Sequence, residues 1–420
     1  MRILTYKIFL FIKLIVREFK AQKLRMALTI AAIAWGTISI TLLMAFSVGL
    51  DNQMKKALSG LGKRIVIVWG GQTSKVYQGL PPGRRIHLHP EDVDFLKERI
   101  PEIEEISGEY LRWGVTLEYK RKQINKLVAG VAPEFQDMRS HYAEMGGRFI
   151  NKIDYDNKKR VIFLGSRVAE ELFGDDIDPV GEIIEVNEIP FIVIGVMVDK
   201  MQNSNYHGPD ENYSVIPATT FVMIFGDPWL DNIVYSIREG VDSKLVEQEL
   251  FRVMGGKYRF DPTDSPALWT WDLIQNAEIE RKIFFGIEIF MWFIGGMTLL
   301  IAGVGVANIM YVAVRERTRE IGTKIALGAE RKHIIFQFMT EALSIAFVGG
   351  FLGIMFSLAV CNLFRMLPME GALEFLGRPT VNWPVAIATV ATLSVIGFMA
   401  GLFPARKAAS INPVDALRYE

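Results

Sequence analysis

Four stretches of this 420-residue chain contain no Asp, Glu, Lys or Arg, and they limit what the chain can fold into more than any other feature. They cover residues 26–50, 289–314, 342–364 and 381–405, and each has 23 to 26 residues. About 20 helical residues, rising ~1.5 Å each, cross the ~30 Å hydrocarbon core of a bilayer. The first stretch is also too long for the roughly 7- to 15-residue apolar core of a cleaved signal peptide. We therefore predict an α-helical membrane protein with four transmembrane helices.

The distribution of basic residues predicts the orientation of these helices. Residues 1–25 contain seven Lys or Arg and one acid, whereas residues 367–380 contain a single basic residue, Arg378. Because basic residues are enriched in cytoplasmic segments, both termini are expected in the cytoplasm, together with the basic loop 315–334. Lys plus Arg and Asp plus Glu both total 47, so the net charge gives no reason to expect nucleic acid as a partner.

The segment between the first two spans predicts a large α+β extracytoplasmic domain. Its alternating and β-branched runs predict strands at 64–68, 161–164, 183–186 and 191–198, and its helical patterns cover 90–99, 168–172 and 243–254. Asn187 and Glu188 are expected at the tip of a hairpin between the last two strands. From Trp271 onward a helical pattern continues into the second span, which predicts a stalk helix that joins the domain to the membrane.

The whole chain is therefore divided into nine predicted segments. They are a cytoplasmic amphipathic interfacial helix (1–25), the first span (26–50), the extracytoplasmic domain (51–282), the second span with its stalk (283–314), a cytoplasmic coupling loop (315–334), the third span (335–364), a short outer loop (365–380), the fourth span (381–405) and a cytoplasmic tail (406–420).

The composition of the spans argues against a channel or a proton-coupled transporter. No ionisable residue lies at the centre of a span, and Glu288 and Glu341 lie at span edges, where a carboxylate reaches the interface. Small residues four positions apart indicate close helix packing. They are Gly303 with Ala307, and Gly349 with Gly353. This spacing fits a rearranging dimer and packing within one chain equally well.

Catalysis within the chain has little support. The segment 60–63 (GLGK) resembles a phosphate-binding loop only in part, because Ala57 replaces the first glycine and Arg64 follows the lysine in place of Ser or Thr. If ATP drives this protein, another polypeptide binds it. His87 and His89 share one face of an extended segment, but a helix start follows them directly, so we predict neither a metal site nor a directly bound cofactor.

The loop between the second and third spans carries the most informative pattern. Residues 315–327 (RERTREIGTKIAL) place Ile321 and Ile325 four positions apart among alternating charges, and Gly328 follows as a C-cap. This predicts a short helix with a small apolar ridge. Its arginines are explained equally well as positive-inside anchors and as contacts with a partner. In the tail, Asn412 and Pro413 predict the start of another helix.

Long runs of the sequence resemble those of MacB/FtsX-like ABC transporter permeases. The run GVGVANIMYVAVRERTREIGTKIALGAERKHIIFQFMTEALSIAFVGGFLG (303–353) is similar to the signature of this family, and GLFPARKAASINPVDALRYE (401–420) is similar to its C-terminal ending. In the outer domain, VIFLGSRVAEELFG (161–174) and VGEIIEVNEIPFIVIGVM (180–197) resemble the MacB-type periplasmic core.

The resemblance implies a permease dimer in which each subunit pairs with an ABC ATPase. Fused members of the family carry an ATPase ahead of the first span, whereas only about 25 residues precede it here, so a separate ATPase is expected. The coupling element would then be the loop 315–334. Its expected ATPase-coupling residues are Glu316, Arg317, Arg319, Glu320, Ile321, Ile325 and Gly328.

Three functions remain open at this point. The first is export of a drug, peptide or lipidated cargo with a periplasmic adaptor and an outer-membrane duct. The second is an FtsX-like signalling scaffold that activates a cell-wall hydrolase, and the third is lipoprotein release. The size of the outer domain and its MacB-type core favour export. The polar loop 201–211 is interpreted as a solvated loop in preference to one that binds cargo or a partner.

Overall fold

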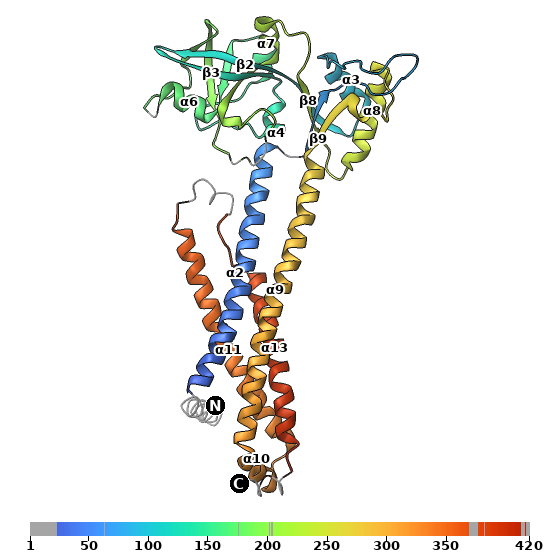
Figure 1. Cartoon of the computed structure of the whole chain (residues 1–420). Helices are drawn as coiled ribbons and strands as arrows, with labels where there is room; N and C mark the ends of the chain where they lie inside the picture. The colour runs from blue at the N-terminus through green and yellow to red at the C-terminus, as the bar shows by residue number, and fades with distance from the viewer. Residues whose placement is uncertain are drawn as a thin grey trace. The chain divides into compact units, whose positions relative to one another are not determined.

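The structure is a computed structural model with two compact units (Figure 1). It describes residues 23–62, 64–174, 176–200, 202, 205–368, 377–381, 383–412 and 416. One unit, called here the helical unit, comprises the described residues up to Gln53 and from Ile283 onward; the other, the head domain, comprises Met54–Lys282. The predicted fold class is confirmed, since four membrane-type helices are present and an α+β domain lies between the first and the second.

The helical unit contains four long helices and one short one. The long helices are α2 (Lys23–Leu61), α9 (Leu273–Glu316), α11 (Arg331–Arg365) and α13 (Trp383–Ala409), and the short helix is α10 (Thr318–Ala326). The candidate spans among the described residues are Met26–Lys56, Leu273–Glu316, Arg331–Arg365 and Ala386–Ala409. Each overlaps one of the four charge-free stretches, because only there is a helix apolar over the full thickness of the hydrocarbon core.

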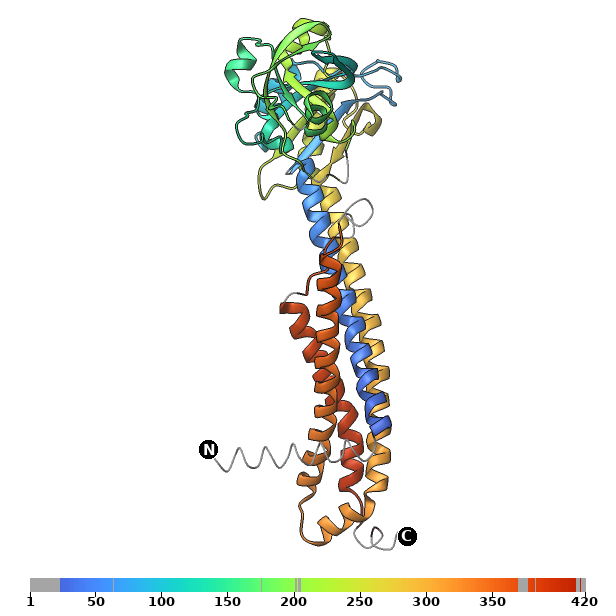
Figure 2. The same cartoon turned by 90° about the vertical axis from the view of Figure 1, so that its left-hand side faces the viewer.

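Glycines allow the helices of this unit to pack closely. A Cβ atom at Gly353 of α11 would lie 2.6 Å from Cβ of Thr37 in α2, and a Cβ atom at Gly349 would lie 2.8 Å from Cβ of Ile33 in α2. A Cβ atom at Gly303 of α9 would lie 2.5 Å from a methyl carbon of Ile396 in α13. Helices α11 and α13 run side by side, as Figure 2 shows. The three predicted glycines therefore serve packing within one chain, and Ala307 lies against the same core.

The head domain is built on nine described strands. They are β1 (Ile65–Gly70), β2 (Ile103–Tyr119), β3 (Lys122–Val131), β4 (Val161–Leu164), β5 (Ile183–Val186), β6 (Ile189–Val196), β7 (Tyr213–Pro217), β8 (Asn232–Ile237) and β9 (Leu268–Asp272). Their order is β3-β7-β4-β6-β5-β2-β8-β1-β9, and β2 also pairs with β3. Six strands thus close on themselves as a barrel lobe, and β8, β1 and β9 continue from β2 as a sheet lobe.

One long strand joins the two lobes. The first part of β2, Ile103–Glu109, pairs with β8, and the part from Tyr110 onward pairs with β3. The register shifts between Arg112 and Val115, where Gly114 has a φ of +69°. A bulge of this kind bends a strand and increases its twist. Because β2 belongs to both lobes, its backbone and its hydrogen bonds to neighbouring strands connect the two lobes directly.

Short helices cover the strands. In the sheet lobe these are α3 (Glu91–Arg99) and α8 (Ser243–Tyr258), and in the barrel lobe they are α5 (Lys152–Asp156), α6 (Ser166–Phe173) and α7 (Ala218–Phe225). Helix α4 (Phe135–Arg139) packs against β8 and β2. Two 3-10 turns, Asp210–Asn212 and Ser265–Ala267, precede β7 and β9. Apolar side chains of helices and strands form the core between these layers.

Several sequence predictions are confirmed by these elements and others need correction. Strands 161–164 and 183–186 are confirmed, and the turn between β5 and β6 contains Asn187 and Glu188, both with positive φ. The helical pattern predicted from Trp271 onward needs correction, because Trp271 lies in strand β9 and α9 begins at Leu273. Strands β2, β3, β7, β8 and β9 were not predicted. Residues 1–22 of the amphipathic N-terminal segment, and residues 413–415 and 417–420 of the C-terminal tail, lie outside the described residues.

Candidate functional site

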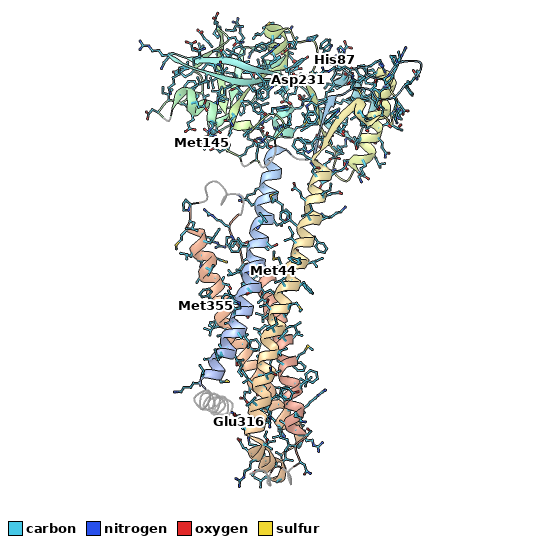
Figure 3. All side chains as sticks on the ribbon, viewed as in Figure 1. Met44, His87, Met145, Asp231, Glu316 and Met355 are labelled. Atoms are coloured by element: carbon cyan, nitrogen blue, oxygen red, sulfur yellow. The ribbon has the colours of Figure 1, made fainter. Side chains whose placement is uncertain are left out.

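The first candidate region is the connection between α9 and α11. Helix α9 ends at Glu316, labelled in Figure 3, and Arg317 interrupts the helix with φ −104° and ψ 16° before α10 begins at Thr318. An Nη1 nitrogen of Arg317 lies 3.7 Å from an Oε2 oxygen of Glu341 in α11. The ion pair links the bend to the neighbouring helix. Glu341, predicted to reach the membrane interface, is thus a partner of Arg317.

The apolar ridge predicted for this loop faces inward. Ile321 is only 3% exposed and belongs to the core of the helical unit together with Phe338 of α11, and Ile325 is partly buried against the same core. Ile321 therefore contacts its own helical unit and not solvent. An amphipathic helix buries its apolar side against its own bundle and leaves its charged side to solvent. Ile321 and Ile325 seat α10 on the helical unit.

The exposed side of α10 carries a different set of residues. Arg319, Glu320 and Thr323 are exposed, and Leu327 is 85% exposed. Lys324 forms an i,i+4 ion pair with Glu320 at 2.8 Å. Glu320, Thr323 and Leu327 follow a helical spacing of three and four, so they share one side. Leu327 was not singled out by helical spacing, because it lies outside the Ile321–Ile325 pair.

Gly328 determines how Leu327 is presented. Its φ is +93°, its N–H donates to the Ile325 carbonyl at 3.0 Å, and the Ala329 N–H donates to the Lys324 carbonyl at 3.0 Å. This pattern of helix termination requires a left-handed conformation that glycine adopts without strain. The predicted capping role of Gly328 is confirmed. The chain turns immediately after Leu327 and leaves its side chain projecting from the end of α10.

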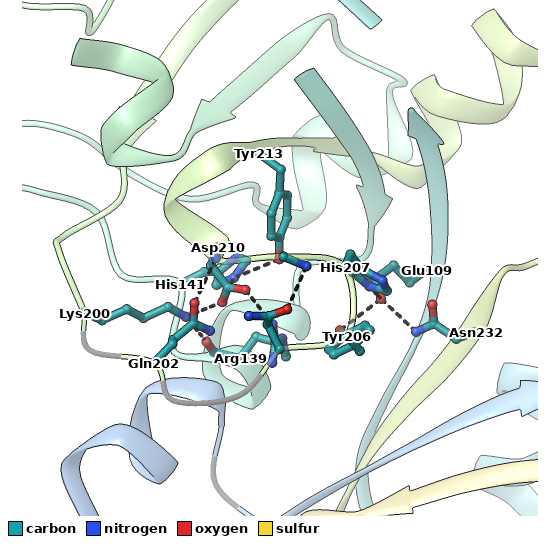
Figure 4. A network of polar contacts seen from close by, with 12 residues as sticks. Glu109, Arg139, His141, Lys200, Gln202, Tyr206, His207, Asp210, Tyr213 and Asn232 are labelled. Carbon is teal, nitrogen blue, oxygen red and sulfur yellow. Dashed lines mark hydrogen bonds and ion pairs between the residues drawn. The ribbon is translucent and has the colours of Figure 1, made fainter. Parts of the chain in front are cut away.

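The second candidate region is a buried polar network in the head domain (Figure 4). Asp210 accepts hydrogen bonds from Arg139 at 2.7 Å and pairs with Lys200 at 2.6 Å and His141 at 3.0 Å. The Arg139 and Asp210 side chains are at most 1% exposed. Burial alone would raise the pKa of the Asp210 carboxyl, but Arg139, Lys200 and His141 hold it well below its usual value. Burial lowers the pKa of Lys200 to about 8, opposed by Asp210.

A second carboxylate extends this network to the sheet lobe. Glu109 of β2 is fully buried and accepts hydrogen bonds from the Tyr206 hydroxyl at 3.0 Å and from Asn232 of β8 at 2.7 Å. Its Oε2 oxygen also lies 3.1 Å from Nε2 of His207. Burial opposes ionisation of Glu109, yet His207 and Asn232 keep its pKa below the usual value. The Arg139 guanidinium lies over the Tyr206 ring, 4.7 Å from its centroid, and connects the two carboxylate clusters.

The network joins the loop 199–212 to both lobes and to β1 and β9, the strands that adjoin helices α2 and α9 in the chain. Tyr206 contacts Trp69 of β1 and Trp271 of β9, with ring centroids 5.9 and 6.4 Å apart. Strand β1 follows α2 in the chain, and β9 directly precedes α9. The interpretation of residues 201–211 as a solvated loop is therefore wrong for Tyr206, His207 and Asp210, whose polar groups are buried among partners.

The histidine in this network predicts acid sensitivity. Burial, followed by the charge of Lys200, lowers the pKa of His141 from 6.5 to about 4. The unfolded chain therefore binds a proton between pH 6.5 and 4 that the folded chain does not bind. Stability should fall as the pH decreases through this window, by about 3 kcal/mol in total. Hydrogen exchange of the head domain at pH 7.0 and 4.5 measures this loss. The variant His141→Gln should show a smaller difference between the two pH values; an unchanged difference would contradict the assignment.

Of the two histidines His87 and His89, one has a packing role in the structure. The ring of His87 stacks on Trp229, with centroids 4.1 Å apart. In the part of the chain that the structure describes, no group of three or more His, Cys, Asp or Glu side chains is placed to hold a metal ion.

A membrane unit of four spans with a large α+β domain between the first and second defines a permease-type membrane protein. The model of the MacB-like periplasmic core domain matches residues 26–253, and that of the FtsX-like permease C-terminal domain matches residues 292–413. The chain belongs to the MacB/FtsX-like family of ABC transporter permeases, as its sequence resemblance indicates.

Several individual relatives are named as export proteins. The chain is 30% identical over 407 residues to the macrolide export ATP-binding/permease protein MacB of Bdellovibrio bacteriovorus, covering 95% of this chain and 60% of the relative. It is 29% identical over 406 residues to the pyoverdine export ATP-binding/permease protein PvdT of Pseudomonas syringae pv. syringae, covering 95% and 58%. The chain thus spans a little over half the length of these relatives.

A solved structure is also similar to part of the chain. It is the crystal structure of the periplasmic region of MacB from Actinobacillus actinomycetemcomitans, with 18% identity, a TM-score of 0.43, and coverage of 53% of this chain and 95% of that one.

Proposed function

We propose that this chain is the permease subunit of an ABC exporter in the bacterial inner membrane, with both termini in the cytoplasm. A separate ATPase would bind ATP and move the permease, and the head domain would act in the periplasm on a drug, peptide or lipidated cargo. The family membership supports the transporter class, and the export names of the macrolide and pyoverdine relatives support export over signalling or lipoprotein release. A permease dimer, a periplasmic adaptor and an outer-membrane duct belong to this proposal.

The observation that carries the proposal is the continuity of α9. This helix runs without a break for 44 residues, from the end of β9 to the bend at Arg317, a length of roughly 66 Å at ~1.5 Å per residue. It contributes residues to both compact units. A helix held by its backbone hydrogen bonds transmits a displacement along its axis, so motion at α10 would reach β9 through one continuous helix.

The exposed side of α10 is the proposed ATPase contact. Arg319 and Glu320 offer charges, and Leu327 offers an apolar side chain that is already solvent-exposed before a partner binds. Interfaces commonly combine a buried apolar anchor with a polar rim. Ile321, Ile325 and Arg317 instead hold α10 on the helical unit, so their contribution to coupling would be mechanical.

Two substitutions on this side test the proposal. We expect Leu327→Asp and Arg319→Glu each to reduce the ATPase recovered with the tagged chain from native membranes in mild detergent by at least roughly tenfold, about 1.4 kcal/mol or more. Recovery is measured by mass spectrometry and by ATP hydrolysis in the eluate. The matched controls are Met366→Asp and Arg365→Glu, which change exposed residues at the far end of α11.

Normal size-exclusion profiles for both variants would show that the permease itself is intact. Full recovery of the ATPase with both α10 variants would exclude this side as the contact. Ile321→Asp does not serve the same purpose, because a carboxylate at this buried position would destabilise the helical unit directly.

A further inference from the structure

A cleft of about 350 Å³ opens between the two lobes of the head domain. One wall is helix α3 of the sheet lobe, with Val93 and Asp94, and the opposite wall is helix α7 of the barrel lobe, with Val222. The floor contains Gly108 and Tyr110 of β2, at the point where this strand leaves β8 and begins to pair with β3. Ligand sites occur preferentially at such junctions between folded parts, with volumes of about 300–1,000 Å³.

The floor and the α7 wall are held in place before any ligand arrives. Tyr110 stacks on Phe221 of α7, with ring centroids 5.5 Å apart. Thr220 of α7 donates a hydrogen bond to the Lys159 carbonyl at 2.9 Å, and Thr219 donates to the Tyr155 carbonyl. These contacts tie α7 to α5 and to the segment that follows it. The floor and the α7 wall of the cleft are thus fixed parts of the head domain.

The chemistry of the cleft combines apolar walls with a few polar groups. Val93, Val222 and Leu230 are apolar, and the polar groups that line it include the phenol of Tyr155 and the carboxylate of Asp94. A mostly apolar lining with a small number of polar groups is typical of sites for small organic ligands.

The electrostatic surroundings of the cleft are negative on its Tyr155 side. The pKa of Tyr155 is raised by burial first, and then by the charges of Glu134, Asp94 and Asp156. All three charges are carboxylates. Lys158 is the cationic residue of the lining, and both it and Asp94 are exposed. Lys158 has the longer side chain and lies on a turn, so its ammonium can remain in water when the cleft is filled.

We propose that this interlobe cleft binds an amphipathic organic cation, with its apolar body between Val93 and Val222 and its charged group at the Asp94 carboxylate. The structure assigns the site from its shape and chemistry alone. Only the further step, that such a cation is the transported cargo, rests on the proposed function. Binding is expected from the permease without ATP or ATPase, because the cleft is complete within one chain.

The test measures equilibrium binding of two fluorescent probes to the purified full-length chain by fluorescence anisotropy at a fixed detergent concentration. Rhodamine 6G is a cation and fluorescein is an anion, and both carry the same three-ring xanthene system. We expect rhodamine 6G to bind at least tenfold more tightly than fluorescein. Probe partitioning into detergent or onto the spans is the same for every variant and is therefore removed by comparison.

The variants locate the binding. Val222→Trp fills the cleft and should weaken rhodamine 6G binding at least tenfold, whereas Met223→Trp, the next residue of α7 and exposed outside the lining, should leave binding within twofold. Asp94→Asn should weaken binding about fivefold, and Glu98→Gln, an exposed acid of the same helix outside the lining, should not.

Each outcome decides for or against the cleft. Unchanged rhodamine 6G binding by Val222→Trp would overturn the site, and equal affinity for the two probes would overturn its preference for cations. Thermal unfolding of each variant accompanies the binding measurement, and Val222 is partly exposed in the folded chain, so Val222→Trp should still fold. Neither failure would affect ATPase recovery with Leu327→Asp, so this proposal and the proposed function fail separately.

Discussion

Replacing Asp210 by Asn should destabilise the head domain by about 3–5 kcal/mol, the usual loss when one partner of a buried ion pair is removed. The asparagine side chain has nearly the same shape, so the change removes charge and little packing. It leaves the Arg139 guanidinium and the Lys200 ammonium in the domain interior without their common carboxylate, at 1% and 13% exposure. The other carboxylate of the network, Glu109, is already engaged by Tyr206, Asn232 and His207.

Hydrogen exchange of the full-length chain in detergent measures this effect locally. Amides of residues 205–213 and 139–141 should exchange at least roughly 100-fold faster, since about 1.4 kcal/mol corresponds to a factor of ten. The matched control is Asp199→Asn, the same substitution at an exposed position of the same loop, and its exchange should match that of the unmodified chain. Equal protection in both variants would show that the network contributes little to the stability of the head domain.

A second substitution separates the loss of the ion pair from general damage. Lys200→Met in the Asp210→Asn background removes one of the two cations left without a carboxylate. If buried charge is the cause, the double variant should regain part of the protection lost in Asp210→Asn, so the two effects should not add. Additive losses would instead indicate that the two residues act independently. The network connects the loop 199–212 to both lobes. Loss of the network is therefore expected to loosen the connection between β2, β8 and β7.

The parts of the fold that the sequence predicted are those governed by strong local constraints. Charge-free stretches of more than 20 residues have few alternatives to membrane spans, because a charge in hydrocarbon costs about 3 kcal/mol or more. The β5–β6 hairpin was visible because two short apolar strands flank Asn187 and Glu188, and asparagine in particular tolerates the left-handed conformation. The continuation of the second span into the head domain was visible from helical periodicity.

The parts that were missed depend on contacts between distant residues. Strand β2 is polar at many positions because it passes between two lobes and faces different neighbours along its length, which removes a regular alternation. Asp210 pairs with Arg139, 71 residues away, and Glu109 pairs with Asn232, 123 residues away. No local pattern marks such partners. In the candidate coupling element, helical spacing identified the apolar pair Ile321 and Ile325, but spacing alone does not say whether such a pair faces a partner or its own bundle.

The second large effect is expected in the helical unit, where Gly353→Leu should disrupt the packing of α11 on α2. A Cβ atom at this position would lie 2.6 Å from Cβ of Thr37 and 2.8 Å from the Ala34 carbonyl oxygen. Neither a Cβ atom nor a backbone oxygen moves aside by a change of rotamer. The two helices would have to separate, and overpacking of this kind costs about 1–3 kcal/mol even where side chains can adjust.

The matched control is Gly296→Leu in α9, the same substitution at a span glycine whose Cβ position has no atom within 4 Å among the described residues. Thermal stability measured by size-exclusion chromatography of the detergent-solubilised chain should fall by roughly 6–12 °C for Gly353→Leu, if the cost is about 3 kcal/mol. It should change by at most about 2 °C for Gly296→Leu. Because the clash lies between two helices of one chain, the loss should not depend on protein concentration. A loss that decreased at higher concentration would instead place Gly353 at an interface between copies.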